Sequence, residues 1–417
     1  MKKILSVLLC LTVFFTFAAC SPAYKPAEIK AEDLMKNIAA QPTTGAEIDD
    51  VFINAAADFS INLFKETVDG GKNSLISPLS VMLALAMTAN GADNNTLTEM
   101  ETVLGGLPTE ELNKYLYTYA NSLPSEKKSV LETANSIWFK DGVFNVNPEF
   151  LQANADYYGA AAYKSAFDGQ TVTDINNWVK NNTKGLIDKI IDEITEDNIM
   201  FLINTVLFDA EWLAVYKKEN VSSNTFTAFD GKEQSVKFMR SEEYKYLEDG
   251  ESAIGVIKPY FGNHYSFAAL LPSEGVSINE YIASLTGERF IDVIKNAERI
   301  RTITSIPKFK YDYEISMVDA LMKMGMTEAF DDFGADFTKM GNAVGYDNVY
   351  IGDVLHKTYI SVDELGTKAG AVTSVAIGPT SSEPSAYKIV NLNRPFVYAL
   401  IDNATGLPAF IGTVLKV

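Results

Sequence analysis

The spacing of apolar side chains predicts helices in the first part of the chain. Over Ile48–Val68, apolar residues recur every three or four positions, which is typical of an amphipathic helix. Ser77 followed by Pro78 forms a helix start, with a capping side chain and proline at the first helical position. Because Val81–Ala89 is apolar on nearly every face, we expect this second helix to be buried all round.

The middle of the chain combines a third helix with a strand. The helix should be capped by Thr173 and end near Gly185, and its apolar face carries Ile175, Trp178 and Val179. Phe201–Phe208 is a continuous apolar run with β-branched residues, too short for a typical helix. We interpret it as a central strand that buries Asn204.

The second half of the chain is dominated by strand patterns. Further strands are expected at residues 253–258, 265–271 and 301–310, with a helix at about 315–324. The C-terminus forms a hairpin in which residues 396–402 and 408–415 are joined by a turn at 403–406. Helices early and strands late predict the α+β class, with a single domain over residues 46–417.

A segment rich in glycine and proline interrupts this pattern. Residues 364–394 lie between two strand-like regions, yet contain Gly366, Gly370, Gly378, Pro379 and Pro384. A stretch this long without regular structure is usually functional or disordered.

The N-terminus carries a targeting signal. Two lysines precede an apolar run that ends in small residues before Cys20, so we interpret residues 1–20 as a signal peptide too short to span a bilayer. Phe17–Cys20 resembles a bacterial lipobox, which predicts lipid attachment at Cys20 and a flexible tether over residues 21–45. The alternative is ordinary cleavage near Ala19. Either way we expect an extracytoplasmic protein, a cell-surface lipoprotein or a secreted one, with membrane contact only through the lipid.

Composition excludes several classes of function. The only cysteines are Cys10 and Cys20, so no disulfide can form within the processed chain. The formal charge of −19 becomes −21 when Lys2 and Lys3 leave with the signal peptide (−19 − 2). No basic segment offsets this charge, so we expect no nucleic-acid partner.

The chain shows no pattern that indicates an active site. Its two histidines, His264 and His356, stand in no metal-ligand spacing, and no nucleophile elbow or phosphate-binding motif is present. We therefore expect no metal, no cofactor and no enzymatic activity. His356 and the buried Asn204 should instead have structural hydrogen-bond partners.

Four segments together resemble the serpin family, and the resemblance covers residues 46–417. They are Asn73–Ser80, Asn204–Trp212, Asn393–Val397 and Phe410–Val414. The resemblance implies a large central mixed sheet, additional sheets, about nine helices and an exposed reactive-centre loop at about residues 364–394. It also implies a monomer that inhibits a serine protease.

The family's functional residues map onto this chain by position. The resemblance implies a polar cluster, the shutter, at Ser77, Ser80, Asn204 and His356, where the main sheet opens. It implies a hinge ion pair between Glu364 and Lys308. The hinge itself would comprise Glu364, Gly366, Thr367, Lys368, Ala369, Gly370, Ala371 and Val372.

The loop sequence favours an inhibitory member of the family over a non-inhibitory one. Gly366–Ile377 is small or β-branched apart from Lys368, which stands where the family usually has an acidic residue. With strand alternation, one face would carry Thr367, Ala369, Ala371, Thr373, Val375 and Ile377, and that face can be buried when the loop inserts into the sheet. The alternative is a non-inhibitory serpin that acts as a surface binding module.

The residues around the cleaved bond indicate the class of target. Counting from Glu364 as the family does places the reactive bond at Thr380–Ser381, in a loop a few residues longer than usual. Ala369–Tyr387 contains no Lys or Arg, and its only aromatic residue is Tyr387. We therefore expect a serine protease with a small specificity pocket, elastase-like or subtilisin-like.

Overall fold

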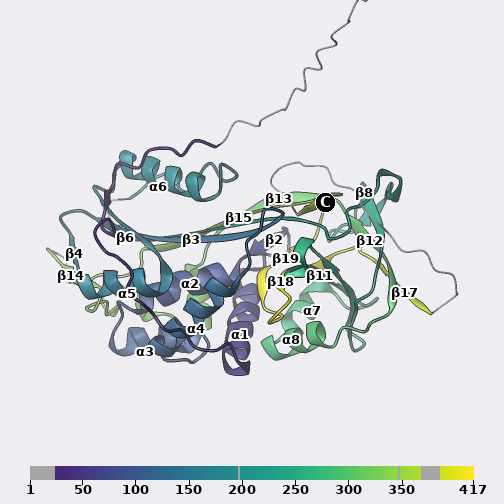
Figure 1. Cartoon of the computed structure of the whole chain (residues 1–417), viewed down its shortest axis with the longest axis horizontal. Coiled ribbons are helices and arrows are strands. Elements are labelled where there is room, and N and C mark those ends of the chain that lie inside the picture. Colours follow the sequence, from purple (N-terminus) through teal and green to yellow (C-terminus); the bar gives the residue numbers. More distant parts are fainter. Residues whose placement is uncertain (1–23, 196–197, 346–347, 368–385) are drawn as a thin grey trace, which may run out of the picture.

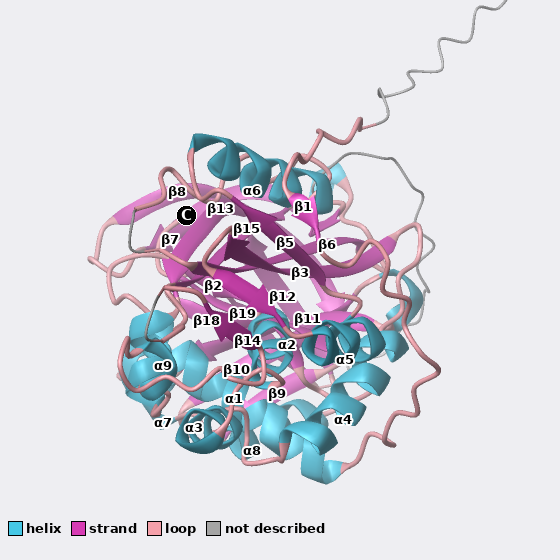
Figure 2. Cartoon of the chain, turned by 90° about the vertical axis from the view of Figure 1, so that its left-hand side faces the viewer, coloured by secondary structure: helices cyan, strands magenta, loops and turns pink. Residues whose placement is uncertain are grey.

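The computed structural model describes residues 24–195, 198–345, 348–367 and 386–417. A long sheet crosses the molecule, with α6 on one face and most of the other helices below the opposite face (Figure 1). Seen from the end, the strands lie between α6 and this larger group of helices (Figure 2). None of the described helices is long and apolar enough to cross a membrane.

The large sheet is the mixed central sheet expected from the sequence. Its seven strands are, in spatial order, β1 (Glu32–Asp33), β5 (Ala161–Ser165), β3 (Ser129–Lys140), β6 (Met200–Glu211), β16 (Gly366–Thr367), β15 (Asp353–Val362) and β13 (Phe309–Ser316). The pairs β3–β5 and β6–β15 are parallel, and the other ladders are antiparallel. β6 contains the predicted strand and buries Asn204.

Three smaller sheets complete the β structure. The six-stranded sheet comprises β2 (Ser74–Ile76), β19 (Pro408–Val414), β18 (Phe396–Asp402), β11 (Tyr265–Pro272), β10 (Ala253–Pro259) and β9 (Tyr246–Asp249). The four-stranded sheet comprises β17 (Tyr387–Asn391), β12 (Arg301–Pro307), β8 (Glu233–Glu243) and β7 (Val221–Thr227), and β14 (Gly341–Ala343) pairs with β4 (Phe144–Val146). The single strand expected at residues 301–310 is wrong, because the chain leaves the four-stranded sheet at Lys308 and continues in the large one.

The described part of the chain forms nine α-helices, the number that the sequence led us to expect. They are α1 (Asp50–Thr67), α2 (Pro78–Ala89), α3 (Asn94–Val103), α4 (Thr109–Ser122), α5 (Pro148–Tyr158), α6 (Gly169–Asn182), α7 (Ile278–Ser284), α8 (Gly287–Lys295) and α9 (Val318–Met324). Three 3₁₀ turns lie at Lys218–Asn220, Phe261–Asn263 and Glu328–Phe330. Every residue of α2 is buried, as predicted, and the Ser77 hydroxyl caps the helix by accepting from Ser80 N.

The start of α6 differs from the prediction. Asp168 rather than Thr173 is the N-cap, because its carboxylate accepts from the backbone of Gln170 and Thr171 while the Thr171 hydroxyl accepts from Asp168 N. This reciprocal capping box satisfies several otherwise unpaired groups at once. Thr173 lies inside the helix and donates to the carbonyl of Gly169.

The N-terminal segment is not the flexible tether that we expected, because residues 24–45 dock along the domain. β1 adds to the edge of the large sheet by pairing with β5. Asn181 of α6 holds the segment, accepting from Ala27 N at 2.7 Å and from the Tyr24 hydroxyl at 3.0 Å. Figure 1 shows this purple segment running past α6 and around the end of the sheet. Apolar side chains such as Leu34 and Ile38 pack against the main core, which explains why the segment is ordered.

Candidate functional site

The two central strands of the large sheet separate over half of their length. β6 and β15 pair directly only from Phe201 opposite Asp353 to Asn204 opposite His356. At the other end, Thr367 of β16 lies between them, opposite Ala210 and Val362. Between these two ends the strands line a narrow cleft with the side chains of residues 206–208 and 359–361. The sheet is therefore open at its centre and closed at both ends of the opening.

A buried polar cluster closes this opening at the end where Asn204 and His356 are paired. The structure brings together the four residues assigned to the shutter. His356 Nε2 accepts from Ser77 N at 3.0 Å, and His356 Nδ1 lies 3.0 Å from Asn204 Oδ1. Asn204 Nδ2 donates to the Ser80 carbonyl at 2.7 Å. The cluster thus joins α2 to both central strands.

The hydrogen bonds fix the protonation state of His356. Because Nε2 accepts from a backbone N–H, the neutral ring must carry its proton on Nδ1 and donate it to Asn204 Oδ1. The ring is fully buried, and this burial lowers the pKa of His356 to about 3. The imidazole is therefore neutral at physiological pH, and both of its nitrogens are engaged in structural hydrogen bonds.

Sequence reasoning missed one member of this cluster. Asn135 of β3 lies directly opposite Asn204 and accepts from its side-chain amide. Asn135 is buried, but no motif in the sequence distinguished it from other asparagines. Only the register of β3 against β6 places the two amides together.

The hinge closes the opposite end of the opening, at Ala210 and Val362. A Cβ atom on Gly366 would lie 2.0 Å from the Ala210 carbonyl oxygen, so only glycine fits against β6 here. The Thr367 hydroxyl hydrogen-bonds the hydroxyl of Tyr260, and Thr367 is buried. Trp212 holds the preceding residues, because its backbone N–H donates to the Leu365 carbonyl and its indole N–H to that of Asp363, both at 2.8 Å.

Lys308 and Glu364 form an ion pair beside the hinge, as the family resemblance implied. Lys308 Nζ lies 2.6 Å from Glu364 Oε2, and about a third of each side chain is exposed. Burial acts to raise the pKa of Glu364, but the hydrogen bond and charge of Lys308 outweigh it and the pKa lies below its usual value. The pair therefore fixes the hinge between the two sheets that meet at Lys308.

A second ion pair, which the sequence did not predict, lies next to the hinge. Lys258 Nζ lies 2.7 Å from Glu243 Oε1, and both side chains are buried. The ammonium also lies 4.5 Å from the ring centre of Tyr216, whose backbone N–H donates to the Glu364 carbonyl. Trp212 stacks on Tyr260 with 4.5 Å between the ring centres, and the Lys258 ammonium also lies over the Trp212 ring. The one sequence signal was a lysine at the end of an apolar strand.

Several assigned residues lie outside the described part of the chain. These are the hinge residues Lys368, Ala369, Gly370, Ala371 and Val372, the reactive-bond residues Thr380 and Ser381, and the lipid-attachment residue Cys20.

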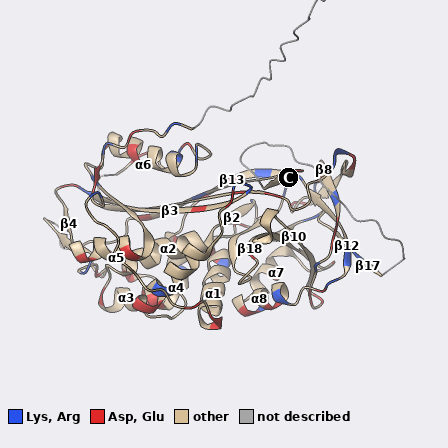
Figure 3. Cartoon of the chain, viewed as in Figure 1, with Lys and Arg blue, Asp and Glu red and all other residues tan. Residues whose placement is uncertain are grey.

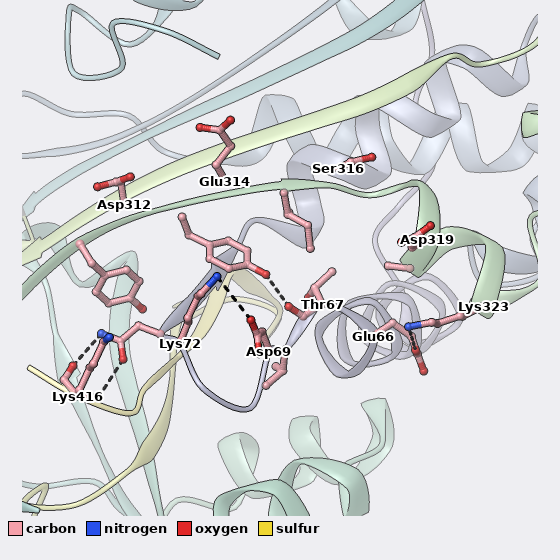
Figure 4. A pocket seen from close by; sticks show the side chains of 16 residues that line it. Glu66, Thr67, Asp69, Lys72, Asp312, Glu314, Ser316, Asp319, Lys323 and Lys416 are labelled. Atoms are coloured by element: carbon pink, nitrogen blue, oxygen red, sulfur yellow. Dashed lines mark hydrogen bonds and ion pairs between the residues drawn. The ribbon is translucent and has the colours of Figure 1, made fainter. Parts of the chain in front are cut away.

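Two further features of the described residues concern metal binding and a surface cleft. No group of three or more His, Cys, Asp or Glu in this part of the chain is arranged to hold a metal ion. A cleft of about 580 Å³ lies between the end of α1 and the edge strand β13 (Figure 4). Its lining carries five acidic residues and three lysines, of which Lys72 lies 3.9 Å from Asp69 and Lys323 4.0 Å from Glu66, so its walls are acidic on balance.

Comparison with known proteins identifies this arrangement. A family model described as serpin (serine protease inhibitor) matches residues 54–417. The chain belongs to the serpin family. Serpins are generally inhibitors of serine proteases and typically not enzymes, and the α+β fold and family expected from the sequence are confirmed.

The solved structures include a close relative of this serpin. The thermophilic serpin tengpin in its native state superposes with a TM-score of 0.90 at 56% identity, over 93% of this chain and 100% of that one. Tengpin in its latent state gives 0.80 at the same identity, over 90% and 100%. The present arrangement of strands is therefore more similar to the native form of that protein.

More distant relatives include one from an archaeon and one from human. An uncharacterized serpin-like protein of Thermococcus kodakarensis is 28% identical over 87% of this chain and 85% of its own length. Neuroserpin of Homo sapiens is 29% identical over 87% of this chain and 90% of its own.

Proposed function

We propose that this serpin inhibits a serine protease by acting as a suicide substrate. The protease serine attacks the carbonyl carbon of Thr380, forms an ester and releases the amine of Ser381. The freed loop then inserts between β6 and β15 and distorts the protease before water hydrolyses the ester. The observation that carries this proposal is the opening between these strands. Gly366 and Thr367 of the hinge already lie between the strands at one end of it.

The register of β16 supports the insertion. Thr367 lies opposite Ala210 and Val362, so a loop that continued the same ladder would place Ala369 opposite Phe208 and Ile360. Ala371 would follow opposite Val206 and Thr358. Phe208 and Val206 belong to the core between the two larger sheets. The alternate loop residues that face this core are therefore small ones, which suits a space enclosed by aromatic and branched side chains.

The same register indicates where insertion meets resistance. Up to Val372 the loop would occupy space in which β6 and β15 have no direct ladder. Thr373 would fall opposite Asn204 and His356, which are paired with each other. Further insertion therefore requires the shutter to open and four paired positions to separate, from His356–Asn204 to Asp353–Phe201.

The proposed target is a serine protease with a small specificity pocket, elastase-like or subtilisin-like. The absence of Lys and Arg from Ala369–Tyr387 supports this class over trypsin-like enzymes. We also propose that the protein acts as a monomer.

Export and lipid attachment at Cys20 are part of the same proposal. Tyr24 is docked on α6 only four residues after Cys20, which allows at most about 14 Å between their Cα atoms. A lipid on Cys20 would therefore hold the inhibitor close to the membrane surface. Radiolabelled palmitate should be incorporated by the wild type and not by Cys20→Ser. Equal labelling of both would contradict lipid attachment at this residue.

The inhibitory mechanism is tested with the residue 21–417 protein and purified elastase, subtilisin and trypsin. The expected result is a complex with elastase or subtilisin that resists SDS, together with a released peptide that begins at Ser381. Thr367→Arg should convert the protein into a substrate, because residue 367 faces the core. Lys368→Arg is the matched control and should still form the complex. Clean nicking of the wild type by every protease would favour the non-inhibitory alternative.

A further inference from the structure

The outer face of the four-stranded sheet exposes an unusual group of apolar side chains. Tyr244 is 55% exposed, Tyr387 52% and Ile389 51%. Arg301 and Ile303 on β12 lie among them. We call these five residues the tyrosine face.

The strand register shows that these side chains are neighbours. In the parallel ladder of β12 and β17, Arg301 is opposite Tyr387 and Ile303 is opposite Ile389. Ile303 is also opposite Glu242 of β8, and Tyr244 follows directly after that strand. Directly opposed residues project from the same side of a sheet, so the four residues on β12 and β17 form one surface, and Tyr244 lies near Arg301 beyond the end of β8.

Together with Glu242, the tyrosine face carries no net charge. Both Nε and Nη2 of Arg301 donate to Glu242, at 2.9 and 2.5 Å, which neutralises the guanidinium. The same guanidinium lies 5.9 Å from the ring centre of Tyr387 and fixes that ring. Tyrosine and arginine held in this way are the residue types that dominate binding energy at protein interfaces.

The position of the tyrosine face identifies its partner. β17 begins at Tyr387, directly after the loop, and Thr380 is only seven residues earlier. The chain therefore allows at most about 25 Å between the reactive bond and Tyr387. A protease domain of about 220 residues has a radius of gyration near 17 Å, which corresponds to a diameter of about 45 Å. A protease bound at Thr380 is therefore within reach of this end of the molecule, where β17 and β12 lie in Figure 1.

We propose that the tyrosine face is a second contact surface for the target protease, outside the loop. This inference rests on the proposed function for the identity of the partner. The complementary protease surface would be apolar, with hydrogen-bond acceptors for the two tyrosine hydroxyls. Lysine and arginine positions lie along β8, β12 and β17 (Figure 3), and Arg301, the one cation of the face, is paired with Glu242, so the effect of the contact should vary little with salt.

The test compares a triple variant with a matched control. Tyr244→Ser, Tyr387→Thr and Ile389→Thr together remove the apolar contacts and keep β-compatible residues on β17. The control carries Phe333→Ser and Val344→Thr, two exposed apolar residues, 86% and 49%, and Val344 directly follows β14, which lies at the opposite end of the molecule from β17 (Figure 1). The second-order rate of loop cleavage by elastase and by subtilisin is measured for each.

We expect the loop of the triple variant to be cleaved at least about tenfold more slowly than that of the wild type, with an unchanged stoichiometry of inhibition. The control variant should be cleaved at the wild-type rate. A synthetic peptide of residues 372–386 reports the chemistry of the loop alone. Rates for the wild type and the triple variant that agree within twofold would overturn the docking proposal. So would an increase in stoichiometry without a change in cleavage rate.

The comparison separates failure of docking from failure of inhibition. If the wild type is nicked without forming a complex, the inhibitory function is wrong, but the cleavage rates still decide whether the tyrosine face binds the protease. If the triple variant has a lower unfolding midpoint, Tyr244→Ser alone is used, because Tyr244 lies beyond the end of β8.

Discussion

Asn204 and His356 are hydrogen-bonded to each other and are also the last directly paired residues of β6 and β15 before these strands separate. His356 Nδ1 lies 3.0 Å from Asn204 Oδ1, and the two residues are opposite each other in the parallel ladder. The contact that satisfies two buried polar groups is therefore located where the sheet must part for a loop to insert. Breaking this hydrogen bond leaves two buried polar groups without a partner, which costs about 1–3 kcal/mol for each unpaired group.

Stability should depend on pH through His356. Burial lowers the pKa of this ring to about 3, while in the unfolded chain it returns to about 6.5. Between these values the unfolded chain binds a proton that the folded chain does not, so the free energy of unfolding falls as the pH falls. The slope is about 1.4 kcal/mol per pH unit below pH 6.5.

Urea unfolding at pH 7.5 and pH 5.5 measures this effect. His356→Asn should be less stable than the wild type at pH 7.5 but should lose less stability on acidification. His264→Asn, which removes the other, partly exposed histidine, is the control. An unchanged pH dependence in His356→Asn would show that the buried imidazole is not the group that titrates.

Lys368 should assist insertion although the family usually has an acidic residue there. Continuing the register of Thr367 with Ala210 places residue 368 opposite Asp209, on the outer face of the sheet. An opposed lysine and carboxylate contribute about 0.2–1 kcal/mol, and two opposed carboxylates repel each other. Lys368→Glu should therefore slow insertion by up to about fivefold.

The measurement is the number of inhibitor molecules consumed for each protease inactivated. This number should rise in Lys368→Glu and return towards the wild-type value when Asp209→Lys is added. A double variant that behaves no better than Lys368→Glu would mean that these two positions do not meet in the inserted state.

The docked N-terminal segment should contribute to stability. Asn181 binds it through three hydrogen bonds, to the Tyr24 hydroxyl and to both backbone groups of Ala27. Asn181→Ala should release residues 24–27, make them sensitive to proteolysis and lower the free energy of unfolding by about 1–3 kcal/mol.

Asn182→Ala is the matched control, because the hydrogen bond that Asn182 donates to the Trp178 carbonyl lies within α6. Limited proteolysis followed by N-terminal mass analysis compares the two variants. Equal resistance to proteolysis in Asn181→Ala and Asn182→Ala would show that the segment is held by other contacts.

The features that the sequence predicted well are those determined by local pattern. α2 follows from a capping serine, a proline and a run of apolar residues, and β6 from a short apolar run. The features that it did not predict depend on contacts between distant residues. Nothing near Asn135 indicates that it faces Asn204, and nothing near residues 24–45 indicates that α6 offers Asn181 as a partner.

The turn at Lys308 shows the same limit within a single predicted strand. Residues 301–310 read as one continuous strand, yet β12 and β13 belong to different sheets. The chain changes sheets where Lys308 N donates to the Lys237 carbonyl and its ammonium reaches Glu364. Both partners are far away in sequence. The position of the Lys308–Glu364 pair came from family resemblance, because no periodicity could have located it.

The most direct test of the central proposal is the change in unfolding midpoint when the loop is cut. The residue 21–417 protein is nicked with a protease that is then removed, and thermal unfolding is compared before and after nicking. If the cut loop fills the opening between β6 and β15, the added strand and its buried side chains should raise the midpoint by tens of degrees. An unchanged or lower midpoint would contradict loop insertion and with it the inhibitory mechanism.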